Sequence, residues 1–159
     1  MRWTILAMGK LKEPHWRAAA DEYLKRLRSY RPIEVQELTD ERADPGDAPA
    51  RVAQVKGREA ERILEQLKPG TRMVALWERG LNLDSVQLAR RLAADETEGG
   101  RELAFVIGGA NGLDARVLDR ADWCLSLSSL TFPHQLARVV LLEQLYRVER
   151  ILRQEPYHK

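Results

Sequence analysis

The chain has 159 residues, of which 26 are Lys or Arg and 24 are Asp or Glu, so its formal net charge is +2. Hydrophobic residues make up 44% of it, which is enough to fill one core and excludes an intrinsically disordered chain. No apolar run reaches the ~18 residues of a membrane span, and residues 2–8 lack a signal-peptide cleavage site, so we expect a cytoplasmic protein. The single cysteine, Cys124, excludes an internal disulfide and multi-thiolate metal sites, and we expect no metal.

The first half of the chain alternates between strand and helix patterns. Residues 3–8 form a short apolar stretch, and over residues 14–30 apolar side chains recur at helical spacing, with Arg and Lys on the other face. Residues 33–38 alternate apolar and acidic side chains, which predicts a strand with one solvated face. The Asp-, Pro- and Gly-rich residues 40–49 predict a loop, and residues 52–67 predict a second helix.

The second half repeats this alternation. We expect three further strands, at residues 73–77, 103–107 and 123–127. We expect three further helices: one that Asp84 or Ser85 caps and Gly99-Gly100 ends, one from Asp114 to Ala121, and one from Pro133 to about Leu152. Five strands alternating with five helices predict a single α/β domain with a parallel sheet.

The last predicted helix is apolar around most of its circumference. A helix of this kind must be buried on two sides. In a domain this small, a second copy of the chain is the simplest cover for the second side, so we expect a homodimer.

The small net charge hides two blocks of opposite sign. Residues 1–31 contain eight basic and three acidic side chains, a local charge of +5. Residues 32–50 contain one basic and six acidic side chains, a local charge of −5. These blocks indicate either two solvated faces or an electrostatic footprint for phosphates near the first helix.

Three strand ends are candidate binding sites, because ligands of parallel α/β sheets bind at the carboxyl ends of the strands. They are Leu76-Trp77, the glycine loop 108–112 and residues 127–132. The glycines at 108, 109 and 112 do not match G-x-G-x-x-G, which disfavours a Rossmann oxidoreductase, and Gly9-Lys10 lacks the Ser or Thr of a Walker loop. The glycine loop is compatible with a tight turn or with close approach of a ligand.

The stretch from Ser126 to His134 combines hydroxyl groups with flanking apolar side chains. Small-molecule sites are mostly apolar with a few placed polar groups, so this stretch suits an adenine or a nucleoside. The alternative is a Ser/Thr turn that caps the last helix, with His134 in its first turn.

The end of the chain carries an aromatic and basic cluster, made of Tyr146, Arg147, Arg150, Arg153, Tyr157, His158 and Lys159. Aromatic side chains beside cations are typical of RNA contact surfaces. The alternative is an amphipathic helix end, where the helix dipole favours cations. Glu143 is either a paired structural carboxylate or a general base, and His15, at the start of the first helix, is expected to be structural.

Several motifs along the whole chain closely resemble the RlmH family of ribosomal large-subunit pseudouridine methyltransferases, in the SPOUT superfamily. They are Ile5-Leu6-Ala7-Met8-Gly9-Lys10, Gly108-Gly109-x-x-Gly112, Leu125-Ser126-Leu127-Ser128, Thr131-x-Pro133-His134, Arg138-Val139, Glu143-Gln144-x-Tyr146-Arg147 and Tyr157-His158-Lys159. The sequence departs from the family at Leu130, where Met is frequent, and at Val148-Glu149, where Ala is common.

The resemblance implies a fold and an activity. The expected fold is one SPOUT domain over residues 1–159, an α/β parallel sheet with helices on both faces and a C-terminal trefoil knot at approximately residues 103–159. The expected assembly is an obligate homodimer. The implied reaction is methylation by S-adenosylmethionine of N3 of a pseudouridine, in a 23S rRNA hairpin at the interface of the ribosomal subunits.

The resemblance also implies site residues. Those expected to bind S-adenosylmethionine are Leu76, Gly108, Leu127, Ser128, Ser129, Leu130, Thr131 and Phe132. His158 and Arg138 are expected near the target base, with His134 shaping the pocket, because the N3 proton must be removed and the developing charge stabilised. Residues expected to contact RNA are Arg147, Tyr157 and Lys159.

Two other functions stay open on the sequence. One is a SPOUT methyltransferase that modifies another RNA position, either a ribose 2′-OH or another base. The other is a non-catalytic ribosome-associated factor that has the fold but does not bind the methyl donor.

Overall fold

The structure is a computed structural model that describes residues 1–159, and its strands and helices alternate along the whole chain. The elements in order are β1 (Arg2–Met8), α1 (Pro14–Leu27), β2 (Ile33–Leu38), α2 (Pro49–Gln66), β3 (Arg72–Asn82), α3 (Ser85–Thr97), β4 (Glu102–Ile107), α4 (Ala115–Arg120), β5 (Trp123–Ser126) and α5 (His134–Leu152). The predicted number and order of elements are therefore confirmed.

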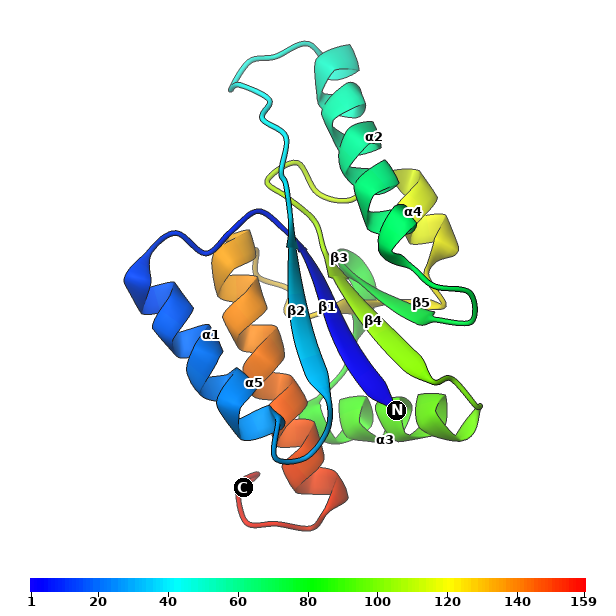
Figure 1. Ribbon diagram of the computed structural model, residues 1–159. Coiled ribbons are helices and arrows are strands. Elements are labelled where there is room, and N and C mark those ends of the chain that lie inside the picture. The colour runs from blue at the N-terminus through cyan, green and yellow to red at the C-terminus, as the bar shows by residue number, and fades with distance from the viewer.

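The five strands form one parallel sheet in the order β2-β1-β4-β3-β5. Because all strands run in the same direction, their carboxyl ends meet at one edge, which lies toward the top in Figure 1. Helices α1, α3 and α5 lie against one face, and α2 and α4 against the other. The predicted α/β parallel sheet, with helices on both faces, is confirmed. No helix has the length and apolar character needed to span a membrane.

Alternate side chains of each central strand supply two separate cores, as the period of two in a strand requires. In β1, Trp3 and Ile5 belong to the larger core under α1, α3 and α5. Leu6 and Met8 of the same strand belong to the smaller core under α2 and α4. Strand β4 is buried on both faces in the same way, which explains its nearly continuous apolar run.

Helix α5 lies on the sheet between α1 and α3 (Figure 1). Its side chains Leu141, Leu142, Leu145 and Val148 are fully buried in the larger core. The sheet, α1 and α3 of the same chain thus cover much of the surface of α5 that was expected to need a second copy. Leu136 and Val140 are half-buried and are not among the side chains packed against the larger core.

Strand β3 is longer than predicted, because it leaves the sheet and then rejoins it. Leu76 and Leu81 both pair with Leu125 of β5, so residues 77–80 form an excursion between them. The excursion returns at Gly80, where a Cβ atom would lie 2.7 Å from the backbone of Cys124. Only glycine permits so close an approach of two backbones.

Candidate active site

A cavity of about 810 Å³ opens at the carboxyl edge of the sheet. This volume lies within the usual range for small-molecule sites. Its wall is formed by residues 76–78, 107–113, 125–128 and 130–134, together with Lys56 and Ala137. The three strand ends selected from the sequence therefore surround one cavity.

Seven of the eight residues expected to bind the methyl donor line this cavity: Leu76, Gly108, Leu127, Ser128, Leu130, Thr131 and Phe132. Ser129, the eighth, is not among the lining residues. His134 also lines the cavity, because α5 begins there directly after Pro133.

Serine side chains shape the loop between β5 and α5. The hydroxyl of Ser126 donates to the carbonyl of Ser128 at 3.0 Å, and the Ser128 hydroxyl accepts the N–H of Leu130 at 2.9 Å. The loop is thus a Ser/Thr turn, and it also lines the cavity. Leu130 is 74% exposed, which makes it the most exposed large apolar side chain of the protein. An apolar side chain left open at a cavity mouth is typical of a binding site.

The glycine loop after β4 is also both a turn and part of the cavity wall. The N–H of Gly112 donates to the carbonyl of Gly109 at 3.1 Å, which closes the turn. A Cβ atom at Gly108 would lie 3.0 Å from the side chain of Leu113, so this strand end is tightly packed. The tight turn is therefore confirmed, and the place of the loop in the cavity wall is compatible with close approach of a ligand.

Arg138 lies inside the protein and is not among the residues that line the cavity. Its guanidinium donates to Glu37 at 2.6 Å and to the carbonyl of Gly9 at 2.8 Å. These bonds tie α5 to the ends of β1 and β2. Burial lowers the pKa of Arg138, against the effect of Glu37. Burial favours the protonated form of Glu37, but hydrogen bonds from Arg17 and the Leu11 N–H, with the charge of Arg138, bring its pKa below the usual value.

The last residues of the chain fold back on the far end of α5. Glu143 accepts hydrogen bonds from the Tyr157 hydroxyl, at 3.1 Å, and from Arg147. Burial and the carboxylate of Glu143 raise the pKa of Tyr157 to about 12. Arg147 lies over the Tyr157 ring, and its Nη1 is 3.5 Å from Nδ1 of His158. Glu143 is therefore a paired carboxylate, which was one of the two roles that the sequence left open for it.

Neither Arg147 of α5 nor the tail residues Tyr157, His158 and Lys159 line the cavity of their own chain. The tail folds back along α5, so that His158 lies beside Arg147 and Tyr157 beside Glu143. Arg147 is 13 residues after His134, which is roughly 20 Å along the helix at 1.5 Å per residue, so His134 and His158 do not meet within one chain.

Six wall residues lie outside the segments selected from the sequence. They are Lys56, Glu78, Ile107, Leu113, Leu125 and Ala137. Lys56 brings a cation to the cavity from α2, which covers the other face of the sheet. No local signal marks it, because its place in the wall depends on how α2 packs. No group of three or more His, Cys, Asp or Glu side chains is arranged to hold a metal ion.

Comparison with known proteins assigns the family. A family model described as "Predicted SPOUT methyltransferase" matches residues 1–158. A protein from Acetivibrio thermocellus, named ribosomal RNA large subunit methyltransferase H, is 47% identical over 159 residues and is matched over its entire length and that of this chain. The chain belongs to the SPOUT methyltransferase family.

An RNA methyltransferase of the SPOUT family needs a site for a methyl donor and for the RNA that accepts the methyl group. The cavity is the only large one in the protein, since the next has about 190 Å³ and lies near Lys68 and Arg101. We therefore take the cavity at the carboxyl edge as the candidate active site of this SPOUT methyltransferase.

Proposed function

We propose that this SPOUT methyltransferase transfers the methyl group of S-adenosylmethionine to N3 of a pseudouridine, in a 23S rRNA hairpin at the ribosomal subunit interface. The name of the relative from Acetivibrio thermocellus supports an rRNA of the large subunit as the substrate. The observation that carries the proposal is that one cavity gathers seven of the eight residues expected at the donor site, with His134 beside them. An enzyme on this substrate acts in the cytoplasm.

The cavity suits S-adenosylmethionine by its chemistry. Ten of its 21 lining residues are hydrophobic, and Leu76, Leu127 and Leu130 can enclose a flat adenine. The backbone groups of the two loops offer hydrogen bonds to the edge of the ring. When bound, S-adenosylmethionine supplies a methyl group activated by its sulfonium. The protein then has to align that methyl with the base, and alignment can supply on the order of 7–11 kcal/mol.

The remaining task is removal of the N3 proton. The imide N3–H is weakly acidic, so a general base, worth roughly 10²–10⁴-fold in rate, can take the proton as the N3–methyl bond forms and the S–methyl bond of the donor breaks to leave a neutral thioether. His158 is our candidate for the base, and His134 shapes the cavity beside it. Arg138, expected near the target base, is buried and would act there indirectly, by holding the ends of β1 and β2 through Gly9 and Glu37.

The distance along α5 supports the expected homodimer. A site that contains both His134 and His158 requires two chains, because His158 lies beside Arg147, which is 13 residues and so roughly 20 Å along α5 from His134. A twofold pair with antiparallel α5 helices would bring the tail of each copy to the cavity of the other. Arg147, Tyr157 and Lys159 of that tail would then contact RNA at the mouth of the cavity.

The arrangement of the last elements supports the expected knot. Strand β5 pairs with β3 at the edge of the sheet, and its loop reaches the cavity beside the glycine loop. The chain then crosses to the face that carries α1 and α3. We propose that residues 103–159 form the trefoil knot of the SPOUT fold in this crossing.

Two assays test the proposed function. Calorimetry with S-adenosylmethionine should show binding, whereas a non-catalytic factor would show none. Purified protein should then transfer labelled methyl groups to 23S rRNA in 70S particles, with less transfer to free large subunits or naked rRNA. Transfer to tRNA alone would contradict the substrate.

A further inference from the structure

Glu59 of α2 is a buried carboxylate with an unusual environment. Three acidic side chains of the protein are 3% exposed or less: Glu59, Asp95 and Glu149. Asp95 pairs with Arg72, and Glu149 pairs with Arg31 and Arg153. Glu59 forms none of the ion pairs of the protein, although a buried carboxylate is normally paired.

Backbone groups of two loops lie against this carboxylate where a cation would be expected. Oε1 of Glu59 accepts the N–H of Glu41 at 3.0 Å, and the backbone of Gly109 packs against both carboxylate oxygens. Glu41 follows β2, and Gly109 belongs to the glycine loop after β4, which lines the cavity. Figure 1 shows these two loops side by side at the carboxyl edge, beside α2.

Gly109 is fitted closely to this carboxylate. A Cβ atom at Gly109 would lie 2.9 Å from Oε1 and 3.0 Å from Oε2 of Glu59. Real Cβ atoms essentially never come so near another heavy atom, so any larger residue at 109 would displace either the loop or the carboxylate. The glycine thus permits the close contact with α2.

The ionised carboxylate is costly at this place. Burial raises the pKa of Glu59 above its usual value, and Asp40 adds to the rise, while the backbone groups of Glu41 and Gly109 and the charge of Arg62 oppose it. A buried polar group that opposes folding in this way indicates a use other than stability.

We infer that Glu59 is a positioning residue for the donor cavity: it holds the glycine loop against α2 through Gly109 and joins it to the loop after β2. This inference rests on the proposed binding of S-adenosylmethionine in the cavity. A fixed loop binds the donor without having to be ordered first, so loosening it should weaken binding.

The variant E59Q tests the inference. Gln keeps the shape but has one acceptor oxygen, and its NH₂ group cannot accept an N–H, so either the bond from Glu41 is lost or the NH₂ group faces Gly109. We expect the Kd for S-adenosylmethionine to rise about tenfold, since the lost bond involves a charged acceptor. The KM for the donor should rise to match, with kcat at saturating donor within about twofold of the wild-type value.

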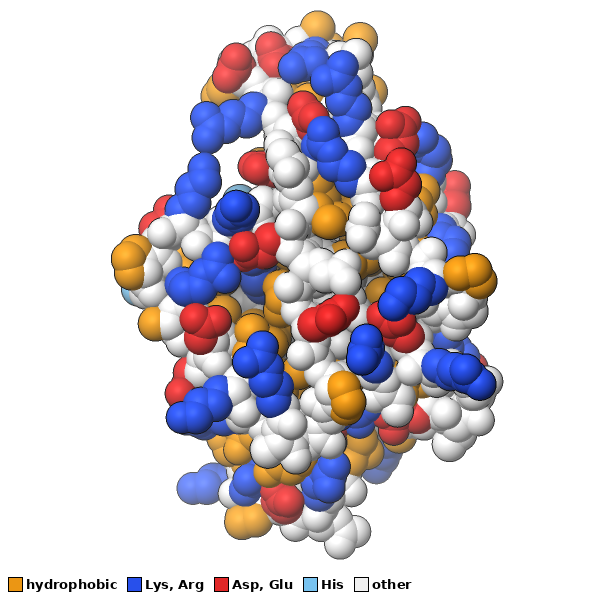
Figure 2. All heavy atoms as spheres, in the orientation of Figure 1, with side chains coloured by type: hydrophobic (Ala, Val, Ile, Leu, Met, Phe, Trp, Pro, Cys, Tyr) orange, Lys and Arg blue, Asp and Glu red, His pale blue; other side chains and the backbone are white.

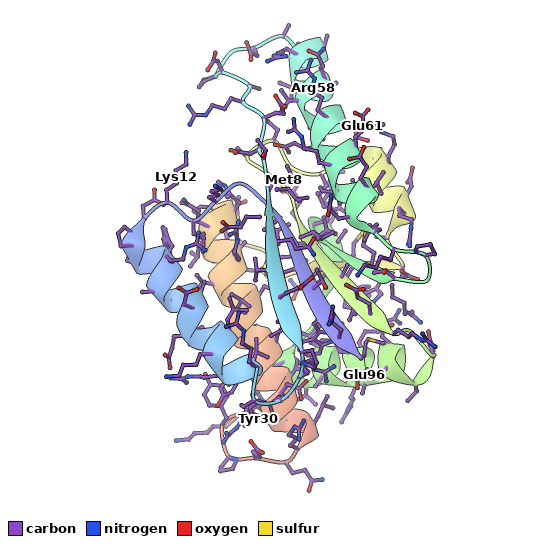
Figure 3. All side chains as sticks on the ribbon, in the orientation of Figure 1. Met8, Lys12, Tyr30, Arg58, Glu61 and Glu96 are labelled. Atoms are coloured by element: carbon purple, nitrogen blue, oxygen red, sulfur yellow. The ribbon has the colours of Figure 1, made fainter.

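The matched control is E61Q, two positions along α2. The side chain of Glu61 is 65% exposed and points away from the sheet, as the labelled stick in Figure 3 shows. E61Q should bind the donor with the wild-type Kd. Equal Kd values for E59Q and the wild type would overturn the inference. A wild-type protein that binds no S-adenosylmethionine would overturn the proposed function and, with it, this inference.

A double-mutant cycle tests the same contact with a substitution in the glycine loop. It tests the inference even if E59Q does not fold. G109A should weaken donor binding about tenfold, because its Cβ meets the carboxylate. In the E59A background the carboxylate is gone, so G109A should add little further loss. Additive losses would contradict the inference, because they would show that the two residues act independently.

Discussion

Arg138 and Glu37 link the last helix to two strand ends at the edge of the candidate site. The Arg138 side chain is 2% exposed and that of Glu37 is 17% exposed. Removing one partner of a buried ion pair leaves the other charge uncompensated. We therefore expect R138M to lower the free energy of unfolding by about 3 kcal/mol, measured by urea denaturation.

The control for this variant is R17M. Arg17 also pairs with Glu37, but its side chain is 44% exposed, so its loss should change the free energy of unfolding by no more than about 1 kcal/mol. A stable R138M protein without activity would show that Arg138 acts on the substrate itself and not through the frame.

The pH dependence of stability should report on Glu37. Its pKa in the folded protein lies below the usual 4.5, so the ionised carboxylate stabilises the fold at neutral pH. This contribution is complete above the unfolded pKa and is lost as the pH falls through the folded pKa. Urea unfolding from pH 7 to pH 3 should show a smaller loss of stability for E37Q than for the wild type. Parallel curves would contradict the assignment.

The three histidines should differ in their effect on turnover. H158A removes the proposed base and should lower kcat about 100-fold. H134A alters the cavity wall and should mainly raise the KM for the donor. H15A is the control: His15 is exposed on α1, with its ring tilted against that of Trp16, and its loss should leave both constants unchanged. Unchanged kcat in H158A would remove His158 from the mechanism.

At the scale of elements, the excursion of β3 depends on Gly80. A Cβ atom there would lie 2.7 Å from the backbone of Cys124, and a backbone cannot move aside as a flexible side chain can. We expect G80A to destabilise the protein by about 1–3 kcal/mol in thermal unfolding.

The control variant, G57A, should change the stability in the opposite direction. Gly57 lies inside α2, and a Cβ there would meet only the mobile end of Arg116 at 3.0 Å. G57A should therefore raise stability by about 0.5–1 kcal/mol, because Ala is the better helix former. A neutral effect of G80A would show that β3 and β5 can separate without loss.

The elements were predictable because the apolar period changes clearly along the chain. The alternation in residues 33–38, the helical spacing from Pro14 and the apolar run of β4 each depend on local sequence. The return of β3 to the sheet was not predictable, since Gly80 meets Cys124 from a distant segment. The three strand ends of the cavity could be predicted, because each follows a strand that is recognisable in the local sequence. The places of Lys56 and Glu59 could not, because they depend on how α2 packs on the rest of the chain.

At the scale of the whole molecule, opposite charges are mixed over the surface. Figure 2 shows Lys and Arg interspersed with Asp and Glu on the face it presents, including the part over α2. A net charge of +2 gives few unpaired cations for phosphates, so affinity for free RNA should be low. Such a surface suits recognition of an assembled particle, in which many contacts of other kinds are available.

The proposed dimer makes a prediction about mixed variants. At a donor concentration well below the raised KM of H134A, H134A and H158A should each have low activity alone, because every site lacks one histidine. After subunit exchange in an equal mixture, half of the dimers carry both variants, and each of these has one intact site. Activity should then recover to about a quarter of the wild-type value. No recovery, with exchange shown by mass spectrometry, would place both histidines in the same chain's site.

The measurement that tests the account most directly is mass mapping of the rRNA after reaction with 70S particles and S-adenosylmethionine. The account predicts one new methyl group, on N3 of a pseudouridine in a 23S rRNA hairpin at the subunit interface, and none when the protein is omitted. A methyl group on a ribose 2′-OH or on another base, or 23S rRNA that stays unmodified, would contradict it.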